Sequence, residues 1–266
     1  MKTAWMNPDN HKKFKHRTFI NLIKRSYFLI LAGKWSRFGK YILTDTVNIL
    51  NQYNLTFKKK YISCPICNYK NHSFVHLSNS YQISWNSSCQ NCDSRSRHRG
   101  LYFLYKNYLT NSLNKKILHF APEKNLANAI KKFGENRYYT TDYNMTDVDF
   151  PNEDVQALNF ESNSFDIIFI NHVLEHVRND NQALKEISRI LKNDGYVIIT
   201  IPGNWKRMKT KVFVPPTSNG HYRDYGIDVF EKLQNHFNLV KKINLFKFHG
   251  EKHAIKKLET AFVCKK

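Results

Sequence analysis

The sequence contains no hydrophobic run long enough to cross a membrane. Its longest uncharged apolar stretch is 27–33 (YFLILAG), whereas a spanning helix needs about 20 apolar residues. The basic stretch before it is long, and no cleavage site of small residues follows, so a signal peptide is not indicated. We therefore expect a cytoplasmic protein, with a peripheral position at the membrane as the alternative.

Cysteine is also scarce, but its distribution is informative. Four of the five cysteines form two CxxC pairs, Cys64 with Cys67 and Cys89 with Cys92. This usage favours a reducing compartment and a metal over disulfides. Each pair lets two thiolates reach one ion, and two pairs complete a tetrahedral zinc site. We predict a zinc ribbon over 61–100, whose closed four-thiolate site is structural; the alternatives are two unrelated pairs or a redox pair.

Acidic residues are few and unevenly placed. The chain has 42 Lys and Arg against 21 Asp and Glu, for a net charge of +21. Residues 1–60 carry 13 basic and 2 acidic side chains, whereas 117–205 carry 8 and 13. The middle is typical of an enzyme core, and the basic ends are suited to an anionic partner.

Residues 1–60 interleave basic with apolar side chains. Five of the apolar residues fit one helical face: Phe19, Ile20, Ile23, Tyr27 and Ile30. This pattern predicts either a helix packed on the main domain with a solvated basic side, or an amphipathic helix on anionic lipid or nucleic acid.

From residue 116 onward the pattern alternates between strands and helices. We predict strands at 116–120, 138–141, 164–170 and 196–202, and helices at 125–133 and 181–191. Two further strands are expected at 239–246 and 258–264, after a helix at 227–237. Such alternation indicates a parallel sheet, whose ligands bind at the carboxyl ends of the strands.

The segment 118–202 resembles a class I S-adenosylmethionine-dependent methyltransferase. The resemblance depends on an ordered set of segments: an acid that ends the second strand, an acidic loop (DVQALNF), the fourth strand and its loop (SFDII, NHVLEHV), and the helix and turn before the fifth strand (LKEISRILKNDG). It implies a Rossmann-like seven-stranded methyltransferase sheet with an antiparallel edge. The expected division is a basic segment at 1–60, the ribbon at 61–100 and a methyltransferase domain at 101–266.

The resemblance also implies a cofactor site for S-adenosyl-L-methionine. Asp142 would accept from the ribose hydroxyls, Asp154 from the adenine amine, and the N–H of Val155 would donate to the ring. The family's glycine-rich first loop is replaced here by Ala121, Pro122 and Glu123, as in a subgroup with an Ala-Pro-Glu loop and a ribbon in front. Glu123 would meet the cofactor's ammonium group. The cofactor-binding prediction also includes Asn171; the alternative is a catalytically inactive, methyltransferase-like binding module.

The loop after the fourth strand holds the candidate general base. His172 would face the methyl group and deprotonate a hydroxyl acceptor. Alternatively, His172 and His176 only bond the backbone, and a divalent metal on this cluster is a weaker alternative. The segment 172–176 also fits the H-x-x-E-H protease pattern, which we reject because it follows a buried strand.

The last prediction concerns the acceptor of the methyl group. A Pro-, Gly- and Ser-rich loop after residue 202 contains the candidate substrate residues His221, Arg223 and Tyr225. We favour hydroxyl methylation of a glycan or other small molecule, with peripheral contact of 1–60 with an anionic membrane. The rival acceptor is RNA, contacted by the ribbon and by the arginine run 95–99.

Overall fold

The computed structural model describes residues 19–33, 35–52, 61–78, 82–110, 114–133 and 136–266. Contacts divide the chain into two units. Unit 1 contains the residues up to Tyr102 together with Phe246–Glu259, and unit 2 contains Phe103–Leu245 and Thr260–Lys266. Of the predicted segment 1–60, residues 1–18, 34 and 53–60 lie outside the described residues.

Unit 2 is built on a seven-stranded sheet in the order β12-β13-β9-β8-β5-β6-β7. The strands β5 to β9 are parallel, and β13 is antiparallel to both β9 and β12. The Rossmann-like methyltransferase sheet and its antiparallel edge are thus confirmed. The strands are β5 (Lys116–Phe120), β6 (Arg137–Asp142), β7 (Phe150–Pro151), β8 (Phe165–Asn171), β9 (Leu191–Thr200), β12 (Leu239–Asn244) and β13 (Thr260–Lys265).

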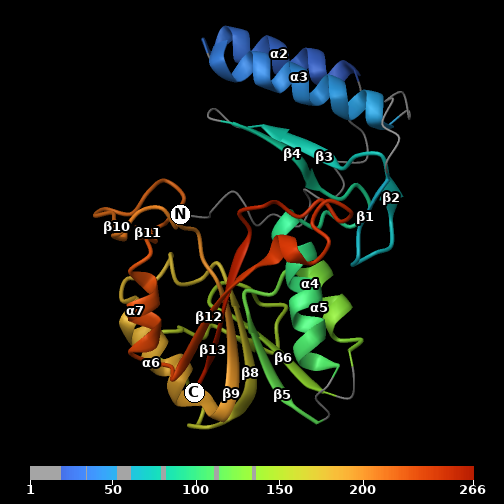
Figure 1. Ribbon diagram of the computed structural model, residues 1–266. Helices are drawn as coiled ribbons and strands as arrows, with labels where there is room; N and C mark the ends of the chain where they lie inside the picture. Colours follow the sequence, from blue (N-terminus) through green and yellow to red (C-terminus); the bar gives the residue numbers. More distant parts are fainter. Residues whose placement is uncertain (1–18, 34, 53–60, 79–81, 111–113, 134–135) are drawn as a thin grey trace. The chain divides into compact units, whose positions relative to one another are not determined.

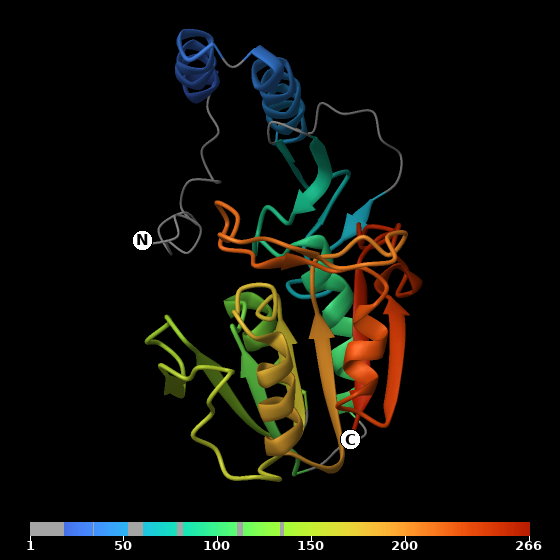
Figure 2. The same ribbon diagram turned by 90° about the vertical axis from the view of Figure 1, so that its left-hand side faces the viewer.

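Helices cover both faces of this sheet. α6 (Asp180–Ile190) and α7 (Val229–Gln234) lie on one face, and α5 (Lys124–Ile130) lies on the other with the later residues of α4 (Ser96–Leu109) (Figures 1 and 2). The helix α6 begins where Asn179 accepts a hydrogen bond from the N–H of Gln182, a common helix cap.

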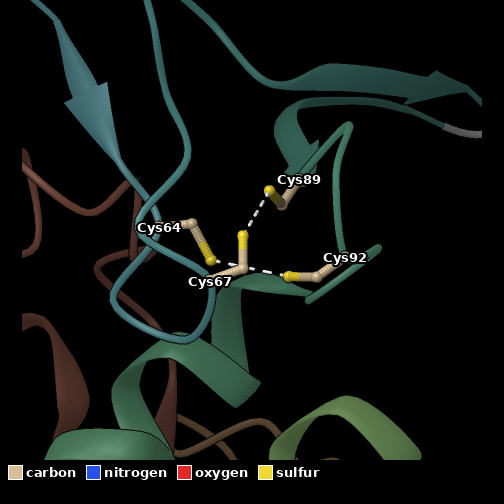
Figure 3. A group of neighbouring side chains, drawn as sticks. All are labelled: Cys64, Cys67, Cys89 and Cys92. Atoms are coloured by element: carbon tan, nitrogen blue, oxygen red, sulfur yellow. Dashed lines mark hydrogen bonds between the residues drawn. The ribbon is translucent and has the colours of Figure 1, made fainter.

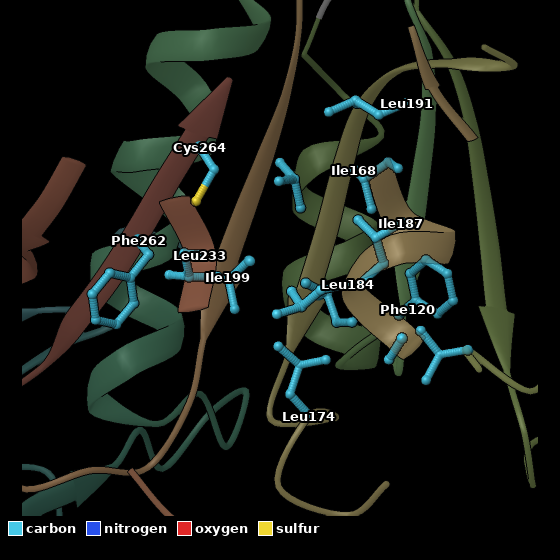
Figure 4. Packing of buried hydrophobic residues seen from close by; sticks show 14 of the residues in the cluster. Phe120, Ile168, Leu174, Leu184, Ile187, Leu191, Ile199, Leu233, Phe262 and Cys264 are labelled. Carbon is cyan, nitrogen blue, oxygen red and sulfur yellow. The ribbon is translucent and has the colours of Figure 1, made fainter. Parts of the chain in front are cut away.

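The core explains why the strands are continuous apolar runs. Ile168 of β8 and Ile199 of β9 are fully buried, and Leu184 and Ile187 of α6 pack onto the sheet with them (Figure 4). A parallel sheet covered on both faces needs apolar residues on both sides of each strand. The fifth cysteine, Cys264, is fully buried in β13.

Unit 1 combines helices with short antiparallel strand pairs. β1 pairs with β2 and β3 pairs with β4. The helix α3 packs on β3, where the side-chain amide of Asn48 accepts from the N–H of His76 (2.7 Å) and donates to its C=O (2.9 Å). The elements are α2 (Phe19–Leu31), α3 (Trp35–Gln52), β1 (Ile62–Ser63), β2 (Lys70–Asn71), β3 (Val75–Ser78), β4 (Ile83–Ser88), the start of α4 and the 3₁₀ helix η1 (Leu245–Lys247) at the boundary with unit 2.

The predicted apolar face of α2 is exposed at the positions that the structure describes, which disagrees with the packed-helix alternative only. The helix forms as expected, but Ile23 is 55% exposed and Tyr27 65% exposed, whereas Leu29, outside the predicted face, is buried. α2 packs on α3, and that contact selects a different stripe of the helix. Within the described residues, no helix combines the length and apolar character needed to cross a bilayer.

The segment between the last two strands does not join the sheet. Phe246–Glu259 belongs to unit 1, although our expected methyltransferase domain, 101–266, included it. The N–H of Ser63 donates to Lys252 O (2.8 Å), and Ser63 also contacts the ring of His253. Both contacts depend on residues far apart in the chain, which local sequence patterns do not reveal.

Candidate functional site

The two CxxC pairs meet at one point of unit 1, as their spacing predicts. The four Sγ atoms all lie within 4.8 Å of one another, with Cys64 3.6 Å from Cys92 and Cys67 3.7 Å from Cys89 (Figure 3). The N–H of Asn68 bonds Cys64 O, and that of Asp93 bonds Cys89 O, so each pair sits in a tight turn. The geometry is consistent with a small zinc ribbon.

The chemistry of the four sulfurs fits a thiophilic cation. Hydrogen bonds from the thiols of Cys89 and Cys92 hold the pKa of Cys64 far below its usual range. Contact with Cys64 raises the pKa of Cys92 to about 12 and also raises that of Cys89. Without a cation, therefore, deprotonation of one cysteine makes deprotonation of the neighbouring thiols unfavourable, whereas Zn²⁺ stabilises all four thiolates together.

The buried Arg99 reinforces this turn. Its guanidinium is fully buried and donates to the carbonyls of Ser94, Asn86 (3.0 Å), His253 (2.7 Å) and Ala254 (2.7 Å). Burial lowers its pKa to about 10, and the charges of the nearby cysteines oppose this effect. Within the arginine run 95–99, Arg99 therefore connects the second CxxC turn to the segment Phe246–Glu259.

In unit 2, the first predicted cofactor loop follows β5. Ala121 has φ +49°, a backbone conformation that glycine adopts most readily. Its N–H donates to Thr141 O at the end of β6 (3.0 Å), and Pro122 next to it is buried. The loop thus keeps the glycine-like turn without a glycine.

Glu123 is held by a polar network that the sequence only partly reveals. Asn171, at the end of β8, donates from Nδ2 to Glu123 Oε2 (3.1 Å) and to His119 Nε2 (3.0 Å). Its Oδ1 accepts from Tyr105 (2.8 Å) and Thr200 (3.1 Å). The Asn171 side chain is fully used, so these contacts make it a support for Glu123.

His119 and Tyr105 were missed. Because Asn171 donates to Nε2, His119 carries its proton on Nδ1, which faces the hydroxyl of Tyr138 at 2.5 Å. Burial raises the pKa of Tyr105 and of Tyr138, so both phenols stay protonated. One available signal was a histidine inside the apolar strand KILHF, where a polar side chain needs a buried partner.

The two predicted acids lie on separate loops. Asp142 ends β6, and its Oδ1 accepts from the N–H groups of Asn144 (2.7 Å) and Met145 (2.8 Å). Its Oδ2 makes no hydrogen bond with the described residues. Asp154 accepts from the backbone and side chain of Gln156. Val155 beside it is buried, and no direct hydrogen bond joins this loop to Asp142 among the described residues.

His172 directly follows β8 and pairs with Glu175. Its Nδ1 lies 2.9 Å from Glu175 Oε1, the Glu175 side chain is 0% exposed, and that of His172 is 31% exposed. Because a carboxylate accepts, Nδ1 donates and Nε2 keeps its lone pair. The pair has the arrangement of a carboxylate-oriented base.

The three predicted substrate residues have different environments. His221 lies beside His176, with ring centroids 4.7 Å apart. Arg223 is buried and donates to the carbonyls of Leu174 (2.6 Å) and Arg178 (2.8 Å). Tyr225 is 1% exposed and bonds Asp180 (3.0 Å). Arg223 therefore attaches β11 (Arg223–Asp224), which pairs with β10 (Lys211–Val212), to the loop after β8, and Tyr225, just after β11, bonds the first residue of α6. Contact of these residues with the acceptor stays a prediction.

The comparisons agree with this architecture. Residues 105–199 match the family described as "Methyltransferase domain", and no curated protein matches the chain significantly. A methyltransferase structure from Bacillus halodurans shares 14% identity over 53% of this chain and 71% of its own, with a TM-score of 0.41. Haemonchus contortus phosphoethanolamine N-methyltransferase 2 shares 16% over 63% and 52%, with a TM-score of 0.47.

A third solved structure, a Haloferax volcanii complex of the Trm112 methyltransferase activator with a methyltransferase, shares 12% identity over 64% of this chain and 91% of its own, with a TM-score of 0.46. All three TM-scores lie below 0.5, so the assignment depends on the family match and the strand order. Residues 105–199 thus match a methyltransferase domain, and the seven strands of unit 2 have the order of a Rossmann-like methyltransferase sheet.

Proposed function

We propose that this protein transfers the methyl group of S-adenosylmethionine to a hydroxyl of a glycan or other small molecule. The observation that carries the proposal is the edge where β5, β6 and β8 end. There the left-handed turn at Ala121, the supported carboxylate of Glu123 and the acid Asp142 come from adjacent parallel strands. Ligands of such sheets bind at this edge.

The residues at this edge fit the cofactor's functional groups. Asp142 can accept from the ribose hydroxyls through Oδ2, because Oδ1 is engaged by its own loop. Glu123 offers a carboxylate to the ammonium group, since Asn171 fixes its position. For Asp154 and Val155 the adenine contacts rest on the resemblance alone.

His172 is the proposed catalytic residue. When bound, S-adenosylmethionine would supply a methyl carbon that the acceptor oxygen attacks in line, with the C–S bond breaking and the sulfur leaving as a neutral thioether. The hydroxyl loses one proton in this reaction, and Nε2 of His172 can take it because Glu175 holds the other ring nitrogen.

The environment of the arginine run favours a small acceptor over RNA. Arg99 is fully buried and committed to backbone carbonyls, and Arg95 is partly buried. Phosphate contacts need accessible cations, so this run offers fewer than its sequence suggests.

The basic N-terminal part supports the proposed contact with an anionic membrane surface. Large apolar side chains are exposed on α2 and at the start of α3, among them Tyr27 (65%), Phe28 (65%), Leu31 (68%) and Trp35 (63%). Such side chains beside basic residues are typical of helices that lie on a lipid surface. Structural zinc at the four cysteines completes the proposal.

Methyl transfer from labelled cofactor tests the function. The full chain, loaded with zinc, is incubated separately with glycan fractions, small-molecule extracts and RNA. We expect label in a glycan or small-molecule fraction, and a fall of about 10²–10⁴-fold in kcat for His172→Ala. His236→Ala is the control, because this histidine lies away from the site. Label confined to RNA would overturn the acceptor class, and unchanged kcat in His172→Ala would remove the proposed base.

A further inference from the structure

A second cluster of metal-ligating side chains lies in unit 2, apart from the cysteines. Glu175 and His176 follow β8, and His221 precedes β11. Each offers one ligand atom, and these three atoms lie within 4.8 Å of one another. Two imidazoles and one carboxylate form a ligand set that zinc enzymes use with an open coordination position.

Glu175 has the clearest signature of a missing partner. Its side chain is fully buried, and Oε1 is paired with His172 Nδ1 at 2.9 Å. Oε2 is buried as well and has no hydrogen-bond partner in the part of the chain that the structure describes. A buried carboxylate oxygen is costly unless a donor or a cation satisfies it.

His176 is oriented as a ligand. Its Nδ1 lies 3.2 Å from Gly220 O, and because a carbonyl only accepts, Nδ1 must carry the proton. The lone pair is then on Nε2. Metal-binding histidines usually donate their other ring N–H to a carbonyl or carboxylate in this way. Gly220, with φ +77°, lies on the same turn as His221.

The loop that supplies His221 is firmly attached. Tyr222 donates from its N–H to Glu175 O (2.8 Å), and Arg223 bonds Leu174 O. The His221 ring lies beside that of His176, with ring centroids 4.7 Å apart.

We propose that Glu175 Oε2, His176 and His221 bind a divalent transition-metal ion, with His172 orienting the carboxylate. Imidazole ligands favour zinc, copper, nickel, cobalt or iron over the oxygen-seeking Mg²⁺ and Ca²⁺. Three protein ligands leave a position for an exogenous oxygen. This assignment of the oxygen rests on the proposed function: it would then belong to the hydroxyl acceptor, because the loop with Glu175 and His176 starts directly after Asn171 at the cofactor edge. Metal binding itself does not depend on that function.

Cobalt binding tests the site without cofactor or acceptor. The full chain is first loaded with one zinc at the cysteines and then dialysed against Co²⁺. We expect one Co²⁺ per chain, with an absorption spectrum lacking thiolate-to-cobalt charge transfer, because no sulfur is in the site. His221→Ala and Glu175→Gln should each weaken binding at least about tenfold. His236→Ala should bind Co²⁺ as the unaltered protein does.

Two results would overturn the proposal. One is a chain that takes up no Co²⁺ beyond the cysteine site; the other is Co²⁺ binding that Glu175→Gln and His221→Ala leave unchanged. Circular dichroism of each variant shows whether it is folded. If His221→Ala does not fold, the near-isosteric Glu175→Gln still tests the site. Because no methyl donor is present, failure here is distinguishable from failure of the proposed methyl transfer.

Discussion

The two units of this chain bury different kinds of side chain. In unit 2 a large apolar cluster, from Leu118 and Ile168 to Phe262, forms the core beneath α6 and α7, and buried polar side chains such as Asn171 and Glu175 lie at or just after the end of a strand. In unit 1 the buried apolar cluster around Phe74 consists otherwise of Cys64 and Cys89, while Arg99, His76 and Asn48 are also buried. Because the described residues of unit 1 bury little apolar surface around the cysteines, this region needs another source of stability, and we infer that zinc and the Arg99 network supply it.

The largest expected effect comes from removing the metal. Structural zinc contributes about 10–16 kcal/mol of apparent binding free energy in small zinc modules. Chelation, or Cys64→Ser with Cys89→Ser, should therefore abolish protection of unit 1 in hydrogen exchange while β5, β8 and β9 stay protected. Cys264→Ala is the converse control: it should weaken unit 2 and retain zinc. Equal loss of protection in both units would contradict the comparison.

Replacing the buried guanidinium should be the next largest change. Arg99→Met leaves several buried carbonyls without a donor, at about 1–3 kcal/mol for each. We expect a loss of more than about 3 kcal/mol in the free energy of unfolding of unit 1, measured by denaturant titration followed with exchange of its amides. Arg37→Met, an exposed position on α3, should stay within about 0.5 kcal/mol of the parent. Similar values for the two variants would rule out a stabilising role for Arg99.

The sheet core should respond to loss of apolar volume. Leu184 is 1% exposed on α6, so Leu184→Ala should cost about 2–5 kcal/mol of unit 2 stability through lost burial and a cavity. Leu239→Ala, at a position that is 39% exposed on the edge strand β12, should cost less. Zinc content should not change in either variant. Loss of zinc from Leu184→Ala would show that the units are not independent.

The smallest effect is expected at the first loop. Ala121 has φ +49°, so Ala121→Gly relieves a conformation that costs an L-residue about 1–2 kcal/mol. Glycine also raises the entropy of the unfolded chain, which offsets part of this gain. We expect stabilisation of no more than about 1 kcal/mol by thermal denaturation, and Ala121→Val should be destabilising. A stabilising Ala121→Val would contradict the assigned backbone conformation.

Much of unit 2 was predictable because its signals are local. The strand at 116–120 has the predicted bounds, and the strands around Ile168 and Ile198 lie where continuous apolar runs place them. The meeting of the four cysteines was predictable too, since two CxxC pairs constrain their own geometry.

The remaining features depend on contacts between distant residues. A helical pattern around Ile23 predicts a helix but not which residues face α3, so the burial of Leu29 could not be predicted. The sequence alone suggests that Arg99 is a surface charge, because its partners, the carbonyls of His253 and Ala254, lie about 150 residues away in the chain. Likewise, Asn171 supports Glu123 only because β5 and β8 are neighbours in the sheet.

The central claim is that the edge formed by Ala121, Glu123 and Asp142 binds S-adenosylmethionine. Calorimetry of the zinc-loaded full chain with the demethylated product of the cofactor tests it most directly. We predict measurable binding that Asp142→Ala weakens by about 1–3 kcal/mol. Asp147→Ala, an exposed acid on the same loop, should leave binding unchanged. At about 1 mM ligand, even a binding free energy of about −4 kcal/mol would half-fill the site. Absence of heat at that concentration would therefore contradict the claim and favour a methyltransferase-like binding module.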